Sequence, residues 1–405
     1  MKHYSNKLLA LLMLGAVLLN GCSSENPEME KPDTSPKTLV SSEAKLTWSS
    51  GDLKSFMSQS GVNIDVSALL YNVTIYHVTY KTIYKGDSIV VSGVVYLPDT
   101  EETVSTVSFQ HGTIGSDAEA PSNLGLGDGQ NILLSALAST GVVALAPDFI
   151  GFGSSVELMH PYYVEDMTAT AVINAIYASR QLAEQEEISI DNELYLAGYS
   201  QGGYATMATH KYYEENEVSY YDLKASFPSS GGYDIKAFQE YFFSLETYHQ
   251  PFFMAYVAQA YVESLDLGDL SDYFNEPYAT NIPGYFDGSM SGGQINDQLT
   301  DVIADLVNND LLENIDTKEE YAYIGEAFVD NSPIDFVPQI PIFMYHGDAD
   351  ITVPYQNSVD VYNQFIANGA STDVVTFTTL EGGTHGTGVV PYLEHLAAEL
   401  SKLAQ

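Results

Sequence analysis

The stretch Gly198-Tyr199-Ser200-Gln201-Gly202-Gly203 carries the clearest chemical signal in the 405-residue sequence. It follows the apolar run Leu194-Tyr195-Leu196-Ala197 and precedes Ala, Met and Tyr residues at helical spacing, so Ser200 stands where a strand turns into a helix. A serine at such a turn takes a strained backbone conformation, and glycines two residues before and after it remove side-chain clashes. The pattern predicts a nucleophilic serine and acyl-transfer chemistry.

Acyl transfer also needs backbone N–H groups that hold the oxygen of the tetrahedral intermediate. The Gln201 amide, at the start of the predicted helix, is one such donor. The strand predicted over 104–110 runs into His111-Gly112-Thr113-Ile114-Gly115, in which Gly112 or Thr113 is the candidate second donor. The alternative interpretation of this segment is an ordinary glycine-rich turn.

The serine needs an imidazole to take its proton and a carboxylate to orient that imidazole. The elbow resembles that of the α/β-hydrolases, and this resemblance implies that the acid and then the histidine follow the serine along the chain. Of the nine histidines, His346 precedes the candidate acids, and only His385 and His395 follow them. His395 lies in a predicted helix, where a surface or packing role is expected. His385 lies in a loop directly after the strand predicted over 373–380, the place where such sheets carry catalytic groups, and is the predicted base.

Two carboxylates compete for the role of the acid. Both follow the strand predicted over 340–346, within Gly347-Asp348-Ala349-Asp350. Asp350 lies far enough past Gly347 for the loop to fold back toward His385, whereas Asp348 is better suited to bond the amides of the turn. Asp350 is therefore the predicted acid, and Asp348 is the alternative.

Four motifs in this order resemble the α/β-hydrolase superfamily of serine esterases, lipases and peptidases over about residues 72–403, and the secretory-lipase and related esterase branch in particular. The resemblance implies the α/β-hydrolase fold, an α/β architecture with a mostly parallel central sheet, helices on both faces and a largely helical cap insertion. It also implies a triad of Ser200, Asp350 and His385 that works without a cofactor. The motifs are Ala146-Pro147-Asp148-Phe149-Ile150-Gly151-Phe152-Gly153, the elbow itself, His346-Gly347-x-x-Asp350-x-x-Val353-Pro354 and Gly383-Thr384-His385.

The N-terminus predicts export. Residues 1–21 combine early lysines, an apolar stretch and small or polar residues, as in a secretory signal peptide. Leu19-Asn20-Gly21-Cys22 resembles a bacterial lipobox, although Asn20 is an unusual residue there, and Cys22 is the single cysteine. We expect lipid on Cys22 to anchor the protein to a bacterial membrane, on the periplasmic side or the cell surface; the alternative is an unmodified cysteine. Residues 22–45 are predicted to be a flexible tether, with the folded domain starting near Leu46.

The charge is strongly negative, with 14 Lys and Arg against 54 Asp and Glu, a formal net charge of −40. Such a surface repels nucleic acid, so no nucleic-acid partner is expected. The acidic stretch from Asp266 to Glu276 lacks the ligand spacing of a calcium loop, and no metal site is predicted. The sequence does not indicate an oligomeric state.

Alternating βα patterns predict a hydrolase core over 46–231 and 339–405. Apolar alternation on either side of Lys85-Gly86-Asp87 predicts a hairpin, 71–84 with 88–97, at the first edge of the sheet. The remaining predicted strands are 104–110, 142–147, 193–198, 223–228, 340–346 and 373–380, and the predicted helices are 128–140, 164–184, 201–215, 356–369 and 389–404.

Residues 232–338 interrupt this rhythm and are predicted to form a cap, or lid, over the serine. The segment is rich in Tyr and Phe, and 299–312 has the spacing of an amphipathic helix. Phe149 and Phe152, with His160-Pro161-Tyr162-Tyr163, are predicted to form the opposite wall of the pocket. Phe149, Phe152 and Tyr199 are the predicted substrate contacts.

The sequence thus predicts a serine hydrolase of small-molecule, lipid or aryl carboxylic esters. One alternative is an exopeptidase-like serine peptidase, in which Glu240 or Glu246 holds the substrate amine. The other is a glycan-binding surface lipoprotein without catalysis, which predicts a degraded triad.

Overall fold

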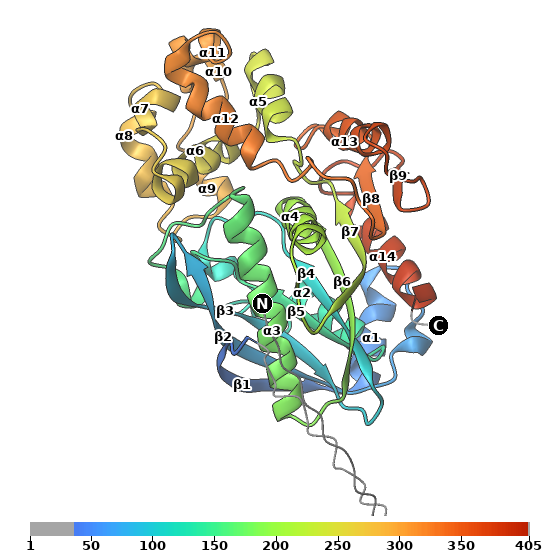
Figure 1. The fold of residues 1–405 in the computed structure, drawn as a ribbon. Coiled ribbons are helices and arrows are strands. Elements are labelled where there is room, and N and C mark those ends of the chain that lie inside the picture. Colours follow the sequence, from blue (N-terminus) through green and yellow to red (C-terminus); the bar gives the residue numbers. More distant parts are fainter. Residues whose placement is uncertain (1–35, 404–405) are drawn as a thin grey trace, which may run out of the picture. The chain divides into compact units, whose positions relative to one another are not determined.

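A nine-stranded sheet forms the centre of the computed structural model, which describes residues 36–403 (Figure 1). The predicted signal peptide and Cys22 lie outside the described residues. Within 36–403, no helix is both long and apolar enough to cross a membrane. The strands are β1 Leu39–Trp48, β2 Val73–Tyr84, β3 Asp87–Pro98, β4 Val104–Gln110, β5 Val142–Pro147, β6 Ile190–Tyr199, β7 Asp222–Ser229, β8 Ile342–Gly347 and β9 Val375–Leu380.

Fourteen α-helices accompany the strands in the described part of the chain. Those of the core are α1 Ser50–Ser60, α2 Gly129–Ala138, α3 Glu165–Gln185, α4 Gln201–Glu215, α13 Tyr355–Ala367 and α14 Val389–Leu403. Those between β7 and β8 are α5 Ile235–Ser244, α6 Phe252–Leu265, α7 Leu270–Tyr273, α8 Tyr278–Asn281, α9 Gly292–Asn296, α10 Ile303–Leu306, α11 Asn309–Asn314 and α12 Ala322–Asp330.

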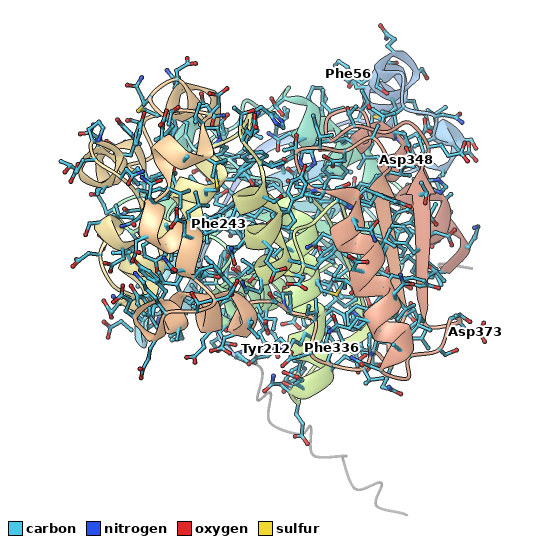
Figure 2. All side chains as sticks on the ribbon, turned by 90° about the horizontal axis from the view of Figure 1, so that it is seen from above. Phe56, Tyr212, Phe243, Phe336, Asp348 and Asp373 are labelled. Atoms are coloured by element: carbon cyan, nitrogen blue, oxygen red, sulfur yellow. The ribbon has the colours of Figure 1, made fainter. Side chains whose placement is uncertain are left out.

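The sheet is mostly parallel, as predicted. Its order is β1-β2-β3-β5-β4-β6-β7-β8-β9; the pairs from β5 onward are parallel, and those from β1 to β5 are antiparallel. The predicted hairpin and the six other predicted strands are confirmed, each end within three residues. Because β4 to β9 run in one direction, the loops after β6, β8 and β9 meet at one edge of the sheet. Figure 2 shows Asp348, after β8, and Asp373, before β9, at opposite ends of this strand pair.

The prediction that the folded domain starts near Leu46 is wrong. β1 begins at Leu39, inside the predicted tether, and pairs antiparallel with β2, so β1 and not the hairpin forms the edge of the sheet. Most of its side chains are exposed or half-buried, and the strand is held by backbone hydrogen bonds. The sequence therefore lacks the apolar alternation by which strands are recognised.

Both faces of the sheet are covered. Successive side chains of β8 point to opposite faces of the sheet. Ile342 and Met344 pack in the cluster that includes α13, and Phe343 and Tyr345 pack in the cluster that includes α14. In the same way α3 joins the cluster on one face, and α2 joins a separate cluster with α1 on the other. This burial on both sides holds the loops at the carboxyl edge in fixed positions.

The cap insertion, residues 232–338, contributes helices α5 to α12 and no strand to the described sheet. The expected amphipathic helix over 299–312 is wrong, because the segment forms the short helices α10 and α11. Val307 between them is extended and bridges Phe274, and the Asn308 side chain accepts hydrogen bonds from the first amides of α11. A tertiary strand-like contact thus overrides local helical spacing.

The glycines of the elbow allow close packing of α4 against the sheet. A Cβ at Gly202 would collide with the carbonyl oxygen of Gln110, whereas a Cβ at Gly325, in α12, meets no atom within 4 Å.

We therefore expect Gly202→Ala to lower the free energy of unfolding by about 3 kcal/mol. Gly325→Ala should raise it by about 0.5–1 kcal/mol, because alanine loses less entropy in a helix. Urea denaturation followed by circular dichroism measures both. Equal stability of the two variants would contradict the close approach at Gly202.

Candidate active site

Ser200 lies between β6 and α4 in a strained conformation. Its φ and ψ are 60° and −122°, in a region that residues other than glycine rarely adopt. The backbone fixes this turn, since the Ser200 amide donates to the Ser229 carbonyl (2.9 Å) and its carbonyl accepts from the Tyr204 amide (3.1 Å). Before the serine, the Gly198 amide donates to the Tyr392 hydroxyl (2.9 Å), which itself donates to the Phe227 carbonyl (2.8 Å). The predicted strand-turn-helix context is therefore present.

His385 connects the serine to a carboxylate. Its Nε2 lies 2.9 Å from Ser200 Oγ, and its Nδ1 lies 2.7 Å from Asp350 Oδ2. An ionised carboxylate only accepts hydrogen bonds, so Nδ1 carries the proton and Nε2 is free to accept from the serine hydroxyl. The structure thus brings the three predicted triad residues into one hydrogen-bonded chain.

Asp350 is buried but satisfied. Its Oδ1 accepts from the amides of Thr352 (2.9 Å) and Val353 (3.0 Å). Burial alone would raise the pKa of Asp350, but hydrogen bonds and favourable electrostatic interactions with His346 and His385 outweigh it and hold that pKa well below its usual value. Asp350 therefore stays ionised beside the imidazole.

Asp348, the alternative acid, takes the structural role. Its exposed side chain accepts a hydrogen bond from the Gly382 amide (2.6 Å) and so joins the loop after β8 to the loop after β9. Asp348 thus lies next to the loop that carries His385, but its side chain is not hydrogen-bonded to the imidazole.

His346 is a site residue that the sequence analysis missed. Its Nε2 donates to Asp350 Oδ2 (3.2 Å) and to the Val353 carbonyl (3.0 Å), and its Nδ1 accepts from Ser358 Oγ (2.6 Å). His346 precedes the candidate acids in the sequence, and it was therefore not predicted to be the base. The sequence did contain a signal for its role, because His346 lies four residues before Asp350 in the same motif and could have been expected to orient that carboxylate.

The predicted oxyanion donors surround the serine. Gln201 begins α4, and a Cβ at Gly112 would lie 3.7 Å from Ser200 Cβ, so the backbone at Gly112 passes beside Ser200. The Thr113 hydroxyl is hydrogen-bonded to that of Tyr162 (2.9 Å). This loop is therefore held close to Ser200.

A buried histidine holds the Gln201 side chain. His160 Nδ1 lies 2.7 Å from the Ile150 carbonyl and therefore carries the proton, so Nε2 accepts from Gln201 Nε2 at 2.6 Å. Burial lowers the pKa of His160 to about 3, which keeps the imidazole neutral.

The predicted substrate contacts of Phe149, Phe152 and Tyr199 are wrong for the pocket that reaches Ser200, because none of them lines it. Phe149 and Phe152 are buried against the ring of His160, with centroids 5.8 and 5.2 Å away. The Tyr199 hydroxyl donates to the His385 carbonyl (2.8 Å), so this side chain holds the loop that carries His385. Aromatic type alone did not reveal that these rings pack inward.

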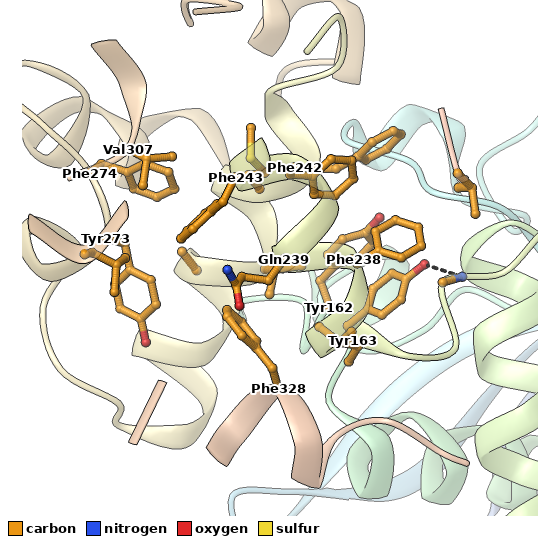
Figure 3. A pocket seen from close by; sticks show the side chains of 18 of the residues that line it. Tyr162, Tyr163, Phe238, Gln239, Phe242, Phe243, Tyr273, Phe274, Val307 and Phe328 are labelled. Carbon is orange, nitrogen blue, oxygen red and sulfur yellow. Dashed lines mark hydrogen bonds between the residues drawn. The ribbon is translucent and has the colours of Figure 1, made fainter. Parts of the chain in front are cut away.

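The pocket at Ser200 extends into the cap insertion (Figure 3) and contains about 830 Å³ of empty space including its mouth. Its lining is almost entirely apolar and aromatic: Tyr162, Tyr163, Ser200, Gly232, Ile235, Phe238, Gln239, Phe242, Phe243, Phe253, Met254, Val257, Ala258, Tyr273, Phe274, Val307, Leu311, Phe328 and Val353.

Residues 126–215 match the secretory lipase family, and this match, which includes the elbow, confirms the resemblance to that branch. A comparison with curated protein sequences finds no match.

Three solved structures share the fold. A Legionella pneumophila protein assigned as a hydrolase has a TM-score of 0.80 at 22% identity and covers 90% of this chain and 98% of its own. The rice cell wall degrading esterase LipA from Xanthomonas oryzae has a TM-score of 0.78 at 22% identity, with coverage of 91% and 98%. Candida antarctica lipase A in its closed state has 0.63 at 17% identity, with 88% and 79%. The predicted α/β-hydrolase fold is confirmed.

The low pKa of His160 makes a prediction for stability against pH. Between pH 6.5 and about 3 the unfolded chain binds a proton at His160 that the folded chain does not. The contribution of His160 to the free energy of unfolding is therefore at its maximum above pH 6.5 and decreases as the pH falls. In His160→Gln the unfolded chain no longer takes up this proton. The free energy of unfolding should therefore fall less steeply with decreasing pH, by up to about 1.4 kcal/mol per pH unit.

Urea denaturation between pH 7 and pH 4 measures the two slopes. His249→Gln, which removes an exposed imidazole, is the matched control and should leave the slope unchanged. Identical slopes for wild type and His160→Gln would show that His160 does not titrate as described.

Proposed function

We propose that this protein is a serine hydrolase of carboxylic esters, with Ser200 as nucleophile, His385 as general base and Asp350 as the acid that orients it. One observation carries the proposal: His385 lies at hydrogen-bonding distance from both Ser200 (2.9 Å) and Asp350 (2.7 Å). The secretory-lipase match and the hydrolase fold support it. The glycan-binding alternative predicted a degraded triad, and the intact geometry argues against it.

The geometry accounts for each step. His385 Nε2 takes the hydroxyl proton as Ser200 Oγ attacks the ester carbonyl carbon, and the carbonyl electrons move to oxygen. The amides of Gln201 and of Gly112 or Thr113 hold that oxyanion. The imidazolium then protonates the leaving alcohol, which leaves an acyl-enzyme. Water, activated by the same imidazole, releases the carboxylic acid and restores the serine.

The pocket favours an apolar or aryl acyl group. Its aromatic and aliphatic lining gains free energy when it covers hydrocarbon and loses free energy when it desolvates charge. The peptidase alternative has less support, because Glu240 and Glu246 are exposed and do not line the pocket.

Two sets of variants test the triad. Ser200→Ala should abolish labelling by a fluorophosphonate and reduce kcat for p-nitrophenyl esters by about 10⁴-fold or more. Asp350→Asn should lower kcat by about 10⁴-fold because the imidazole loses its orienting acceptor, whereas Asp348→Asn should stay within a fewfold of wild type. Ester hydrolysis that survives Ser200→Ala would reject the mechanism, and loss of activity confined to Asp348→Asn would reassign the acid.

The proposal includes export and lipid anchoring through residues 1–21 and Cys22. The signal-like N-terminus and the match to the secretory lipase family support export, and the lipobox-like stretch Leu19-Asn20-Gly21-Cys22 supports lipid anchoring.

Cys22→Ser should move the exported protein from the membrane fraction to the soluble fraction without changing its ester hydrolysis, because the acyl chains supply the membrane affinity. Fractionation with immunoblotting measures this. A variant that remains in the membrane fraction would contradict anchoring through Cys22.

A further inference from the structure

A single glutamine interrupts the apolar lining of the cap part of the pocket. Gln239, on α5, is 5% exposed, and Figure 3 shows its amide among the labelled aromatic side chains of the cap. A buried amide is unfavourable unless its N–H and C=O groups find partners. The bonds that Gln239 makes therefore indicate what the pocket is built to hold.

A lysine fixes the orientation of this amide. Lys236 Nζ donates to Gln239 Oε1 at 2.6 Å. Because an ammonium group has donors and no acceptor, Oε1 must face Lys236, and Nε2 must be the amide atom turned to the pocket. Within residues 36–403, Nε2 is bonded to no protein acceptor. The pocket therefore presents an N–H donor at a defined position.

The charge of Lys236 is balanced outside the pocket. Asp316 accepts from its Nζ at 2.8 Å, and Glu240 lies 3.4 Å away. A carboxylate in the pocket would lose its hydration without meeting a net positive charge. The donor at Gln239 is therefore suited to a neutral oxygen acceptor.

Three tyrosine hydroxyls of the lining already have partners, and that of Tyr163 accepts from the Gly232 amide (3.4 Å). The Tyr162 hydroxyl is bonded to Thr113 (2.9 Å), and the Tyr273 hydroxyl donates to the Leu267 carbonyl (3.1 Å). Gln239 Nε2 differs from the hydroxyls of Tyr162 and Tyr273, because both of its hydrogens remain available to a bound molecule.

Building on the proposed ester hydrolysis, we infer that Gln239 determines specificity and selects acyl chains that carry a neutral oxygen acceptor, a keto or hydroxyl group, beyond the ester carbonyl. A site that hydrogen-bonds a substrate group discriminates strongly against the analogue without it, since the buried donor is then left unpaired. Lys236 is a positioning residue that holds the amide in the donating orientation.

The test compares p-nitrophenyl decanoate with p-nitrophenyl esters of decanoic acids that carry a keto group at successive chain positions. For wild type, kcat/KM should be about tenfold or more higher for at least one keto isomer than for the decanoate. Gln239→Met keeps an unbranched side chain of similar length without a donor, and should lower kcat/KM for the preferred keto isomer to about the value for the decanoate. Lys236→Met should reduce the preference, because the amide is then free to turn.

The matched control is Gln259→Met, in the same cap insertion. Gln259 is also buried, but it does not line the pocket, so its replacement should leave the keto preference intact. Thermal unfolding of each variant checks that it is folded.

Each outcome is distinguishable. Hydrolysis of decanoate with no gain for any keto isomer, or a keto preference that survives Gln239→Met, overturns the role of Gln239 and leaves the ester hydrolase standing. Absence of hydrolysis of every ester, together with absence of fluorophosphonate labelling, overturns the proposed function and this inference with it.

Discussion

The site depends on one buried carboxylate that is kept charged. Asp350 accepts hydrogen bonds from two loop amides and from two imidazoles, and the loop after β8 is folded around it. Burial would otherwise neutralise such a group, and a neutral acid would no longer fix the tautomer of His385. His346 is therefore as much a part of this arrangement as His385, although it does not touch the serine.

The core and the three candidate catalytic side chains could be predicted because their signals are local. A glycine-flanked serine after a strand and a histidine after another strand are patterns of a few residues, and a parallel sheet brings the ends of its strands to one edge. β1 escaped prediction because an exposed edge strand has no apolar alternation. The break between α10 and α11 escaped because it depends on the distant Phe274.

The pocket was the least predictable part of the molecule. Phe149 and Phe152 have the residue type expected of a substrate wall, yet they pack on His160, while the lining comes largely from cap helices without a recognisable motif. Which face of a ring meets solvent is decided by tertiary packing between segments far apart in the sequence. The orientation of the Gln239 amide depends in the same way on Lys236 and on Asp316.

The hydrogen bonds of Tyr392 to Gly198 and Phe227 tie the last core helix to the backbone that presents Ser200. His385 and α14 are also the last of these parts to be made during translation. A growing polypeptide on the ribosome thus carries its serine through most of synthesis with neither the imidazole nor the tyrosine in place. Under the proposed mechanism, Ser200 therefore gains its base only after His385 has been made and the loop after β9 has folded.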